Sequence, residues 1–224
     1  AFLKKLQLSI EEGGYGYKIK GDGPLLFHLG CDYYRDADGT LVYQPKKYIV
    51  KMMEAYVRHF KQKPKHFSSP LPSDDHPELD ESTLIDCLGI TIYMSLVGML
   101  QWLITLGRLD IMQSVTAMSA FRCAPRQGHM DRAKRIFGYV DKYREAAIRV
   151  RPGMPDLTSL DASYPTYDWT NNVYGSRHEE FPMNMPEPLG GLMRIIIYVD
   201  ANLYFDLISG RACTGSLILL NQTP

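Results

Sequence analysis

The chain has 224 residues with 25 basic and 25 acidic side chains, so its formal net charge is zero. A neutral total provides no general attraction to nucleic acid. Hydrophobic residues make up 45% and charged residues 22%, which is ordinary for a soluble globular protein. The four cysteines are far apart and form no CxxC pair, so we expect reduced thiols of an intracellular protein and no zinc site.

The neutral total conceals an uneven distribution of charge. No Lys or Arg occurs between Phe67 and Gly107, where six acidic residues fall, the last of them Asp86. Between Arg122 and Arg151 there are nine basic residues and three acidic ones. The sequence therefore has an acidic middle and a basic segment.

The first predicted element is a β-hairpin over residues 25–44. Two β-rich runs flank the segment DADG, and Asp38-Gly39 is a strong turn signal. A calcium loop is the other interpretation of DADG, but further oxygen ligands of an EF-hand are missing at the required spacings. The hairpin is the better prediction.

A helix is expected next, over residues 44–60, where apolar side chains recur at helical spacing after Pro45. Lys46, Lys47 and Lys51 cluster in its first half. Taken alone, such a cluster indicates a solvated helix face. Residues 61–78 are rich in proline, serine and charge, and they predict an irregular linker.

Residues 87–107 contain no charge and are long enough to span a membrane. Polar residues dilute this stretch, and Asp86 and Arg108 bound it. We therefore expect a buried core helix. A second helix is expected over residues 110–121, with Asp110 as its N-cap.

A third helix is expected over residues 126–150, with an apolar stripe from Met130 to Val140. Arg132, Arg135 and Lys142 lie largely off that stripe. Such a face can contact phosphates, although a solvated face is the commoner outcome. Residues 151–191 contain many prolines and glycines and predict a long irregular connector.

The last segment predicts a hairpin, with strands over residues 193–200 and 213–221. Asp200 ends the first, apolar strand. A carboxylate there either faces solvent or needs a metal or hydrogen bonds, because burying it alone is costly. A two-stranded hairpin is not stable by itself in water, so it must pack on other structure. The first residue is not Met and the chain stops just after this strand, so we expect a piece of a longer polypeptide.

Five stretches, in the same order, resemble the Pol polyprotein of copia-type LTR retrotransposons. Leu109 replaces a proline that is usual in the family, and Asn202 and Leu203 replace an aspartate and a tryptophan. The matching stretches are FHLGCDYYRDADGTLVYQPKKYIVKMMEAY, YMSLVGMLQWL, GRLDIMQSVTAMSAF, HMDRAKRIFGYV, and YVDANLYFD followed by GRACTGSLILL.

This resemblance implies an α+β fold in four regions. Residues 1–66 would be the end of a reverse transcriptase palm with a thumb-like region, and residues 67–150 a helical thumb or connection region. Residues 151–191 would be an irregular connector, and residues 192–224 the first strands of a truncated RNase H-like antiparallel sheet.

The resemblance also implies roles for particular residues. Asp200 would be the first RNase H carboxylate, which is catalytic and a Mg²⁺ ligand in the intact parent. The paired aspartates of the polymerase and the later RNase H carboxylates are absent from this chain. We therefore expect no catalysis by this chain alone and no tight metal binding. The residues implied to contact a template–primer duplex are Leu29, Gly30, Gln44, Lys46, Lys47, Lys51, Arg132, Lys134 and Arg135.

The expected partners are an RNA–DNA hybrid or DNA duplex and the rest of the polyprotein, with no membrane. By the same resemblance, the expected location is intracellular, in the cytoplasm, a virus-like particle or the nucleus. The alternative is a structural or protein-interaction remnant without a nucleic-acid role. In that case the uncharged helix over residues 87–107 would pack into a partner or a lipid phase.

Overall fold

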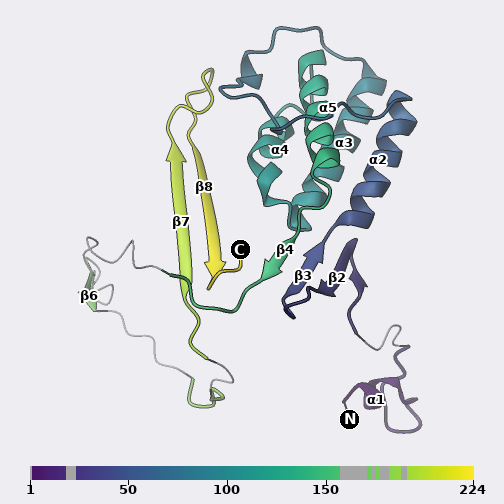
Figure 1. The fold of residues 1–224 in the computed structure, drawn as a ribbon, viewed down its shortest axis with the longest axis vertical. Helices are drawn as coiled ribbons and strands as arrows, with labels where there is room; N and C mark the ends of the chain where they lie inside the picture. The colour runs from purple at the N-terminus through teal and green to yellow at the C-terminus, as the bar shows by residue number, and fades with distance from the viewer. Residues whose placement is uncertain (1, 19–23, 157–170, 173–174, 177–181, 188–190) are drawn as a thin grey trace.

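The computed structural model describes residues 2–18, 24–156, 171–172, 175–176, 182–187 and 191–224. It is a mixed α+β structure with a four-stranded antiparallel sheet, a group of packed helices, and a separate pair of long strands (Figure 1). The α+β prediction is confirmed at this level. The elements are α1 (Phe2–Gln7), β1 (Phe27–His28), β2 (Cys31–Arg35), β3 (Leu41–Gln44), α2 (Lys46–Phe60), α3 (Cys87–Thr105), α4 (Met112–Ser119), α5 (Gln127–Lys142), β4 (Ile148–Val150), β5 (Asn171–Asn172), β6 (Gly175–Ser176), β7 (Ile195–Asn202) and β8 (Cys213–Leu220), with short 3-10 turns at Pro77–Leu79 and Leu109–Ile111.

The predicted hairpin over residues 25–44 is confirmed as β2 and β3. Its turn is closed by hydrogen bonds from the Asp36 amide to the Thr40 carbonyl and from the Gly39 amide to the Asp36 carbonyl. Gly39 has a φ of 84°, a conformation that glycine adopts without strain. The sequence did not predict β1, which extends the sheet on the other side of β2.

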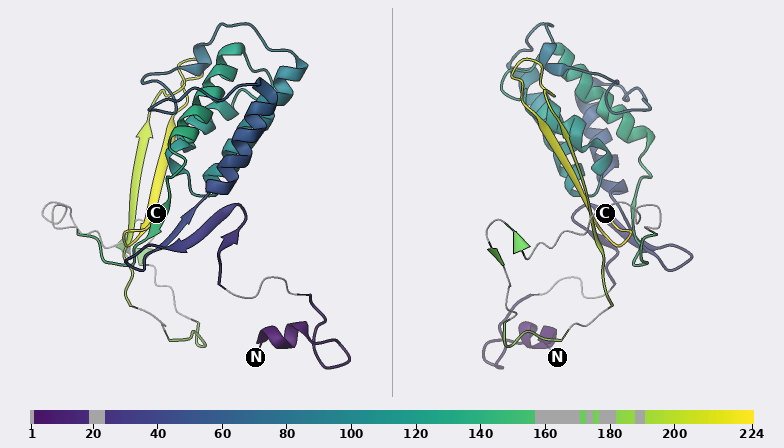
Figure 2. Two further views of the ribbon diagram at one scale, coloured as in Figure 1. Left: turned by 45° about the vertical axis from the view of Figure 1, so that its right-hand side comes forward. Right: turned by 90° about the vertical axis from the view of Figure 1, so that its left-hand side faces the viewer.

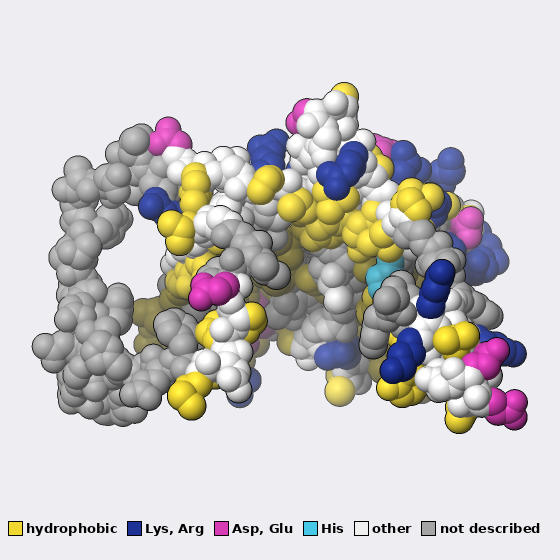
Figure 3. Space-filling view, turned by 90° about the horizontal axis from the view of Figure 1, so that it is seen from below, with side chains coloured by type: hydrophobic (Ala, Val, Ile, Leu, Met, Phe, Trp, Pro, Cys, Tyr) yellow, Lys and Arg dark blue, Asp and Glu magenta, His cyan; other side chains and the backbone are white. Residues whose placement is uncertain are grey.

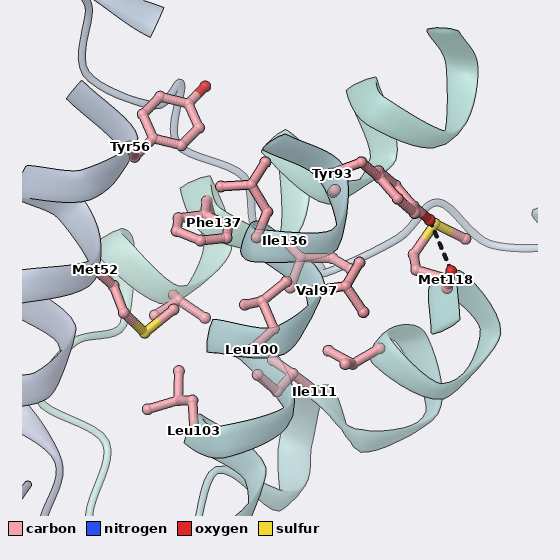
Figure 4. Close-up of a cluster of buried hydrophobic side chains, with 14 of the residues drawn as sticks. Met52, Tyr56, Tyr93, Val97, Leu100, Leu103, Ile111, Met118, Ile136 and Phe137 are labelled. Atoms are coloured by element: carbon pink, nitrogen blue, oxygen red, sulfur yellow. Dashed lines mark hydrogen bonds between the residues drawn. The ribbon is translucent and has the colours of Figure 1, made fainter. Parts of the chain in front are cut away.

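The core lies between α2, α3, α4 and α5, which pack around one cluster of buried side chains (Figure 4). The predicted stripe from Met130 to Val140 is buried, as helical spacing requires. Tyr93 is buried as well, and its hydroxyl donates to the Met118 carbonyl at 2.7 Å. Burial raises the pKa of the Tyr93 phenol, so the hydroxyl stays protonated and keeps this hydrogen bond.

Helix α3 begins as predicted. Asp86 is its N-cap, and its carboxylate accepts from the Gly89 amide at 2.7 Å. Within the described part of the chain, α3 is the helix that is long and apolar enough to cross a membrane by length and composition. One face, which includes Leu96 and Leu100, is fully buried, whereas Trp102 on the opposite side is 42% exposed. The expectation of a buried core helix is therefore correct for one face only.

The predicted third helix is wrong at its C-terminal end. Helix α5 ends at Lys142, and Ile148–Val150 forms β4 instead. Strand β4 pairs antiparallel with β3, with Tyr43 opposite Ile148 and Leu41 opposite Val150. The β-branched residues at positions 148 and 150 suit a strand, and the free edge of β3 supplies the hydrogen-bonding partner.

The predicted N-cap of the second helix is also wrong. Helix α4 begins at Met112 after a short 3-10 turn, and no side chain caps it. Asp110 instead accepts hydrogen bonds from Arg108, whose Nε and Nη2 lie 2.9 and 2.7 Å from its two carboxylate oxygens. Arg108 is only 2% exposed, and a buried guanidinium requires a nearby carboxylate more than the helix requires a cap.

The sheet packs against one end of the helical group. Gly107 follows α3 with a φ of 98°, and a Cβ there would lie 2.9 Å from both Tyr43 and Ile148. Only Pro45 separates β3 from α2, so the start of α2 is fixed beside the hairpin. Because α2 shares its core with α3, α4 and α5, helices on both sides of the predicted boundary at residue 66 pack into one unit. The four-region division stays a prediction.

The predicted C-terminal hairpin is confirmed as β7 and β8, which pair from Ile195 with Leu220 to Asn202 with Cys213. The pair runs lengthwise beside the helical group, whereas α1 lies apart from it (Figure 2). Most side chains of both strands are exposed, including apolar ones on both faces. Most of the predicted connector over residues 151–191 lies outside the described residues.

Candidate nucleic-acid interface

The start of α2 brings two lysines next to the positive end of a helix dipole. Pro45 provides no side-chain cap, and no acidic residue occupies the first turn. The first amide groups of a helix lack partners within the helix, and its N-terminus carries a partial positive charge. Lys46 and Lys47 add two full charges at this point. This arrangement does not favour helix stability, but it attracts anions.

Lys46 is paired at the surface with Glu145, which lies three residues beyond the end of α5. Its Nζ lies 2.7 Å from Glu145 Oε1, and Gln44 Nε2 donates to Oε2 of the same carboxylate at 3.2 Å. The hydrogen bond from Lys46 is the main cause that lowers the pKa of Glu145. Both charged side chains are about half exposed or more, so this ion pair contributes little stability and can be exchanged cheaply.

Lys47 faces the β1–β2 end of the sheet. Its Nζ forms an ion pair with Asp32 and lies 4.9 Å from the centre of the Phe27 ring. The lysine side chain is 63% exposed and the Asp32 side chain 22%, so solvent screens this pair mainly on its lysine side. Lys51 follows one turn later on the same helix and is exposed. The predicted grouping of these three lysines on α2 is therefore present.

Leu29 and Gly30 form the two-residue connection between β1 and β2. Their φ angles are 51° and 103°, and such a pair of positive values is required by type I′ hairpin turns. Gly30 lies against Tyr48 and Leu106, where a Cβ would contact both at 3.2–3.4 Å. The turn therefore packs on the base of α2, and the exposed Leu29 side chain points away from the core.

The basic face of α5 is covered by another segment of the chain. We name residues 61–82 the strap, because this segment crosses α5 from Asp141 to Gly128. Arg132 is held there by two strap carboxylates. Its Nε and Nη2 donate to Asp75 at 2.8 Å each, and its Nη1 donates to Asp80.

Asp80 is held in its charged form by this arrangement. Burial alone would raise the pKa of Asp80, but hydrogen bonds from Ser82 and Arg132 outweigh burial and lower it. The three charged side chains of this cluster are between 9% and 21% exposed. Arg132 therefore fixes the strap to α5 in this structure, and its guanidinium is not displayed to a ligand.

The two other predicted residues on α5 also have intramolecular partners. Lys134 forms an ion pair with Asp131 at 3.1 Å and lies over the Phe60 ring. Arg135 donates from Nη2 to Ser69 Oγ at 3.0 Å. The basic residues among the predicted duplex contacts thus separate into an exposed group at the start of α2 and a covered, partly buried group on α5, whereas Gln44 is only 6% exposed.

Asp200 lies within β7, opposite Gly215, and the strand continues two residues beyond it. Its side chain is exposed, so no metal or hydrogen-bond partner is needed to offset a cost of burial. Within the described ranges, no group of three or more His, Cys, Asp or Glu side chains could hold a metal. Asp200 alone does not fit a two-metal site, which needs several carboxylates, and its catalytic role stays a prediction.

Sequence reasoning missed the acidic partners of the basic residues. Each of these partners forms an ion pair with a predicted contact residue. Three of them lie far away in the sequence, namely Asp75, Asp80 and Glu145, whereas Asp32 is close to its partner Lys47. The complementary acidic and basic segments were a signal for part of this pairing. Seen from the end where α1 and the sheet lie, basic, acidic and hydrophobic side chains are intermingled (Figure 3).

Comparison with known proteins links the chain to a mobile element. No protein-family model matches it, and no solved structure does. A Saccharomyces cerevisiae protein named "Putative transposon Ty5-1 protein YCL074W" is 30% identical over 140 residues. The match covers 61% of this chain and 43% of the yeast protein, so it spans less than half of that relative. This similarity supports a relationship to a retrotransposon protein.

Proposed function

We propose that this chain is part of a retrotransposon RNA-directed DNA polymerase and RNase H polyprotein, and that it contributes binding of the template–primer duplex. The observation that carries the proposal is the pair of lysines in the uncapped first turn of α2, beside the β1–β2 turn. A duplex phosphate there would meet two ammonium groups and free helix amides together. The similarity to a transposon protein supports the polyprotein assignment.

The two ion pairs of this surface differ in how readily they can be exchanged for phosphates. Lys46 would give up the exposed Glu145 carboxylate, and such a pair contributes about 0–1 kcal/mol. Lys47 is exposed itself but would give up the partly buried Asp32 carboxylate. Lys51 extends the same side of α2 by one turn. We assign the covered group on α5 a structural part, and we assign no metal-dependent step to this chain.

The test is binding of a fluorescently labelled RNA–DNA hybrid to the purified chain at several salt concentrations. We expect binding that weakens steeply with salt, because each neutralised phosphate releases counterions. The double variant Lys47→Ala/Lys51→Ala should weaken binding and reduce the slope of log K against log salt by about 1 for each lysine removed.

The matched control is Lys4→Ala/Lys5→Ala, which removes two exposed lysines from α1, apart from the proposed surface. This variant should leave affinity and slope nearly unchanged. Equal effects of the two double variants, or no binding at low salt, would contradict the proposal. Magnesium-dependent cleavage of the hybrid by the pure chain would refute the expectation that the chain is inactive by itself.

A protein-interaction role is the second candidate, and the exposed β7–β8 pair favours it. Ile195, Ile197 and Val199 are each more than half exposed. Apolar side chains on an unpaired sheet usually mark an interaction surface. This role predicts self-association that does not weaken with salt, measured by analytical ultracentrifugation, together with no binding of the hybrid.

A further inference from the structure

The guanidinium group of Arg135 has a buried nitrogen without a hydrogen-bond acceptor, although the group has other contacts. Its Nη2 donates to Ser69 Oγ of the strap, and its guanidinium stacks 4.4 Å from the centre of the Phe67 ring. Its Nε is buried. In the described part of the chain, it is the single buried side-chain nitrogen or oxygen without a hydrogen-bond partner. A buried donor without an acceptor costs free energy, so this gap requires an explanation.

Two other arginines of the chain show what usually fills this position. Nε and Nη2 of Arg108 hold the two oxygens of Asp110, and the same pair of nitrogens in Arg132 holds Asp75. This edge of a guanidinium matches an oxyanion with two oxygens. In Arg135 it faces only the single hydroxyl oxygen of Ser69.

A second cation contacts the preceding serine of the strap, Ser68. Lys142, two turns further along α5, donates from Nζ to Ser68 Oγ at 2.9 Å. Within the described residues, neither Arg135 nor Lys142 forms an ion pair with a carboxylate. Two adjacent serines of the strap therefore each face a cation that has no counter-ion in this part of the chain.

We propose that Ser69 is a phosphorylation site whose phosphate completes the Nε–Nη2 edge of Arg135. A protein kinase would supply the phosphoryl group from a nucleoside triphosphate. The Ser69 oxygen would form a bond to the γ-phosphorus as the bond from phosphorus to the β–γ bridging oxygen breaks. The hydroxyl proton would pass to a base of the kinase, and the nucleoside diphosphate would leave. Ser69 is partly exposed, and its exposed neighbour Ser68 keeps the site at the surface.

The consequence of this modification is a tighter strap. A serine phosphate carries nearly two negative charges at neutral pH and three acceptor oxygens, and opposite arginine it adds charge-assisted hydrogen bonds. These bonds would join the middle of the strap to α5, between the His66–Asp141 contact and the Arg132 cluster. The proposal is independent of nucleic-acid binding.

The test places phosphoserine genetically at position 69 or, as the matched control, at position 73. Ser73 is an exposed residue of the same strap that precedes Asp74 and Asp75. Phosphate at 69 should raise the thermal midpoint by about 3 °C or more, whereas phosphate at 73 should leave it unchanged or lower it. Arg135→Lys should abolish the rise, because an ammonium group lacks the two-donor edge.

A second measurement needs no variant of Arg135. Titration followed by phosphorus NMR should give a phosphoserine pKa at position 69 below the usual value of about 6, because the guanidinium favours the dianion. The phosphate at 73, beside two carboxylates, should not show this decrease. An unchanged thermal midpoint at 69, a rise that persists in Arg135→Lys, or equal pKa values at the two positions would overturn the proposal.

Discussion

Replacement of Arg132 by alanine tests whether this residue fastens the strap or serves a ligand. The substitution leaves Asp75 and Asp80 without their cation, and the two carboxylates are only 12% and 9% exposed. Removing one partner of a buried ion pair costs about 3–5 kcal/mol, whereas a fully exposed pair is worth about 0–1 kcal/mol. Because Arg132 itself is 21% exposed, we expect a loss near the lower end of the buried range, about 3 kcal/mol.

The assay is urea denaturation followed by circular dichroism, with the triple variant Arg132→Ala/Asp75→Asn/Asp80→Asn as a control. The triple variant should recover part of the lost free energy, because it no longer contains unpaired buried charges. Binding of the hybrid duplex to folded Arg132→Ala protein should be unchanged. A stability loss below 1 kcal/mol, combined with a large loss of duplex affinity, would refute the assignment of Arg132 to the strap.

Three further predictions concern the same structural unit. Despite its burial, the pKa of Asp80 in the folded chain is lower than the ordinary aspartate value. Its ion pair therefore stabilises the fold above the ordinary pKa, and this contribution is lost as the pH falls through the lower folded value. Arg132→Ala should flatten this acid dependence of the free energy of unfolding. A glycine-to-alanine substitution within a helix usually stabilises it by about 1 kcal/mol. In Gly138→Ala, however, the new Cβ would collide with the Lys65 carbonyl oxygen, so urea denaturation should show a net loss of stability of about 1–3 kcal/mol. Stabilisation would mean that the strap does not pack on α5. Tyr93→Phe should cost about 1 kcal/mol by the same assay, because it removes a buried hydrogen bond to the Met118 carbonyl, which still accepts from the Phe121 amide; no loss would contradict this hydrogen bond.

The helices could be predicted because each buries one regular stripe. Ile49 and Met52 in α2 and Met130 and Ala133 in α5 recur at helical spacing, and all four are buried. The turn between β2 and β3 could be predicted because Gly39 supplies a positive φ between two strand-like runs. These signals are local, so the sequence alone contains them.

The errors arose where a distant contact outweighed a local signal. Strand β4 has three residues, too few for a periodic pattern, and it exists because the edge of β3 is available to pair with it. Asp110 precedes a helix and is a good capping residue, but the buried Arg108 nearby takes both of its oxygens. No sequence pattern indicated that Arg108 would be buried.

The candidate site shows the same division. Lys46 and Lys47 lie beside the hairpin because one residue joins β3 to α2, which the sequence predicted closely. The partner of Lys46 is Glu145, 99 residues away, and only the tertiary structure brings them together. The roles of the α5 residues depended on a strap whose irregular sequence gives no indication of its path.

The charge segregation along the sequence indicates which surface a duplex would contact first. The acidic middle and the basic segment neutralise each other in part, because the strap places Asp75 and Asp80 on Arg132 with low exposure. A phosphate would have to displace these carboxylates at a cost of several kcal/mol, whereas at Lys46 it displaces the exposed Glu145 carboxylate at about 1 kcal/mol or less. Any duplex binding by this chain should therefore begin on α2, and α5 should contribute only if the strap is removed.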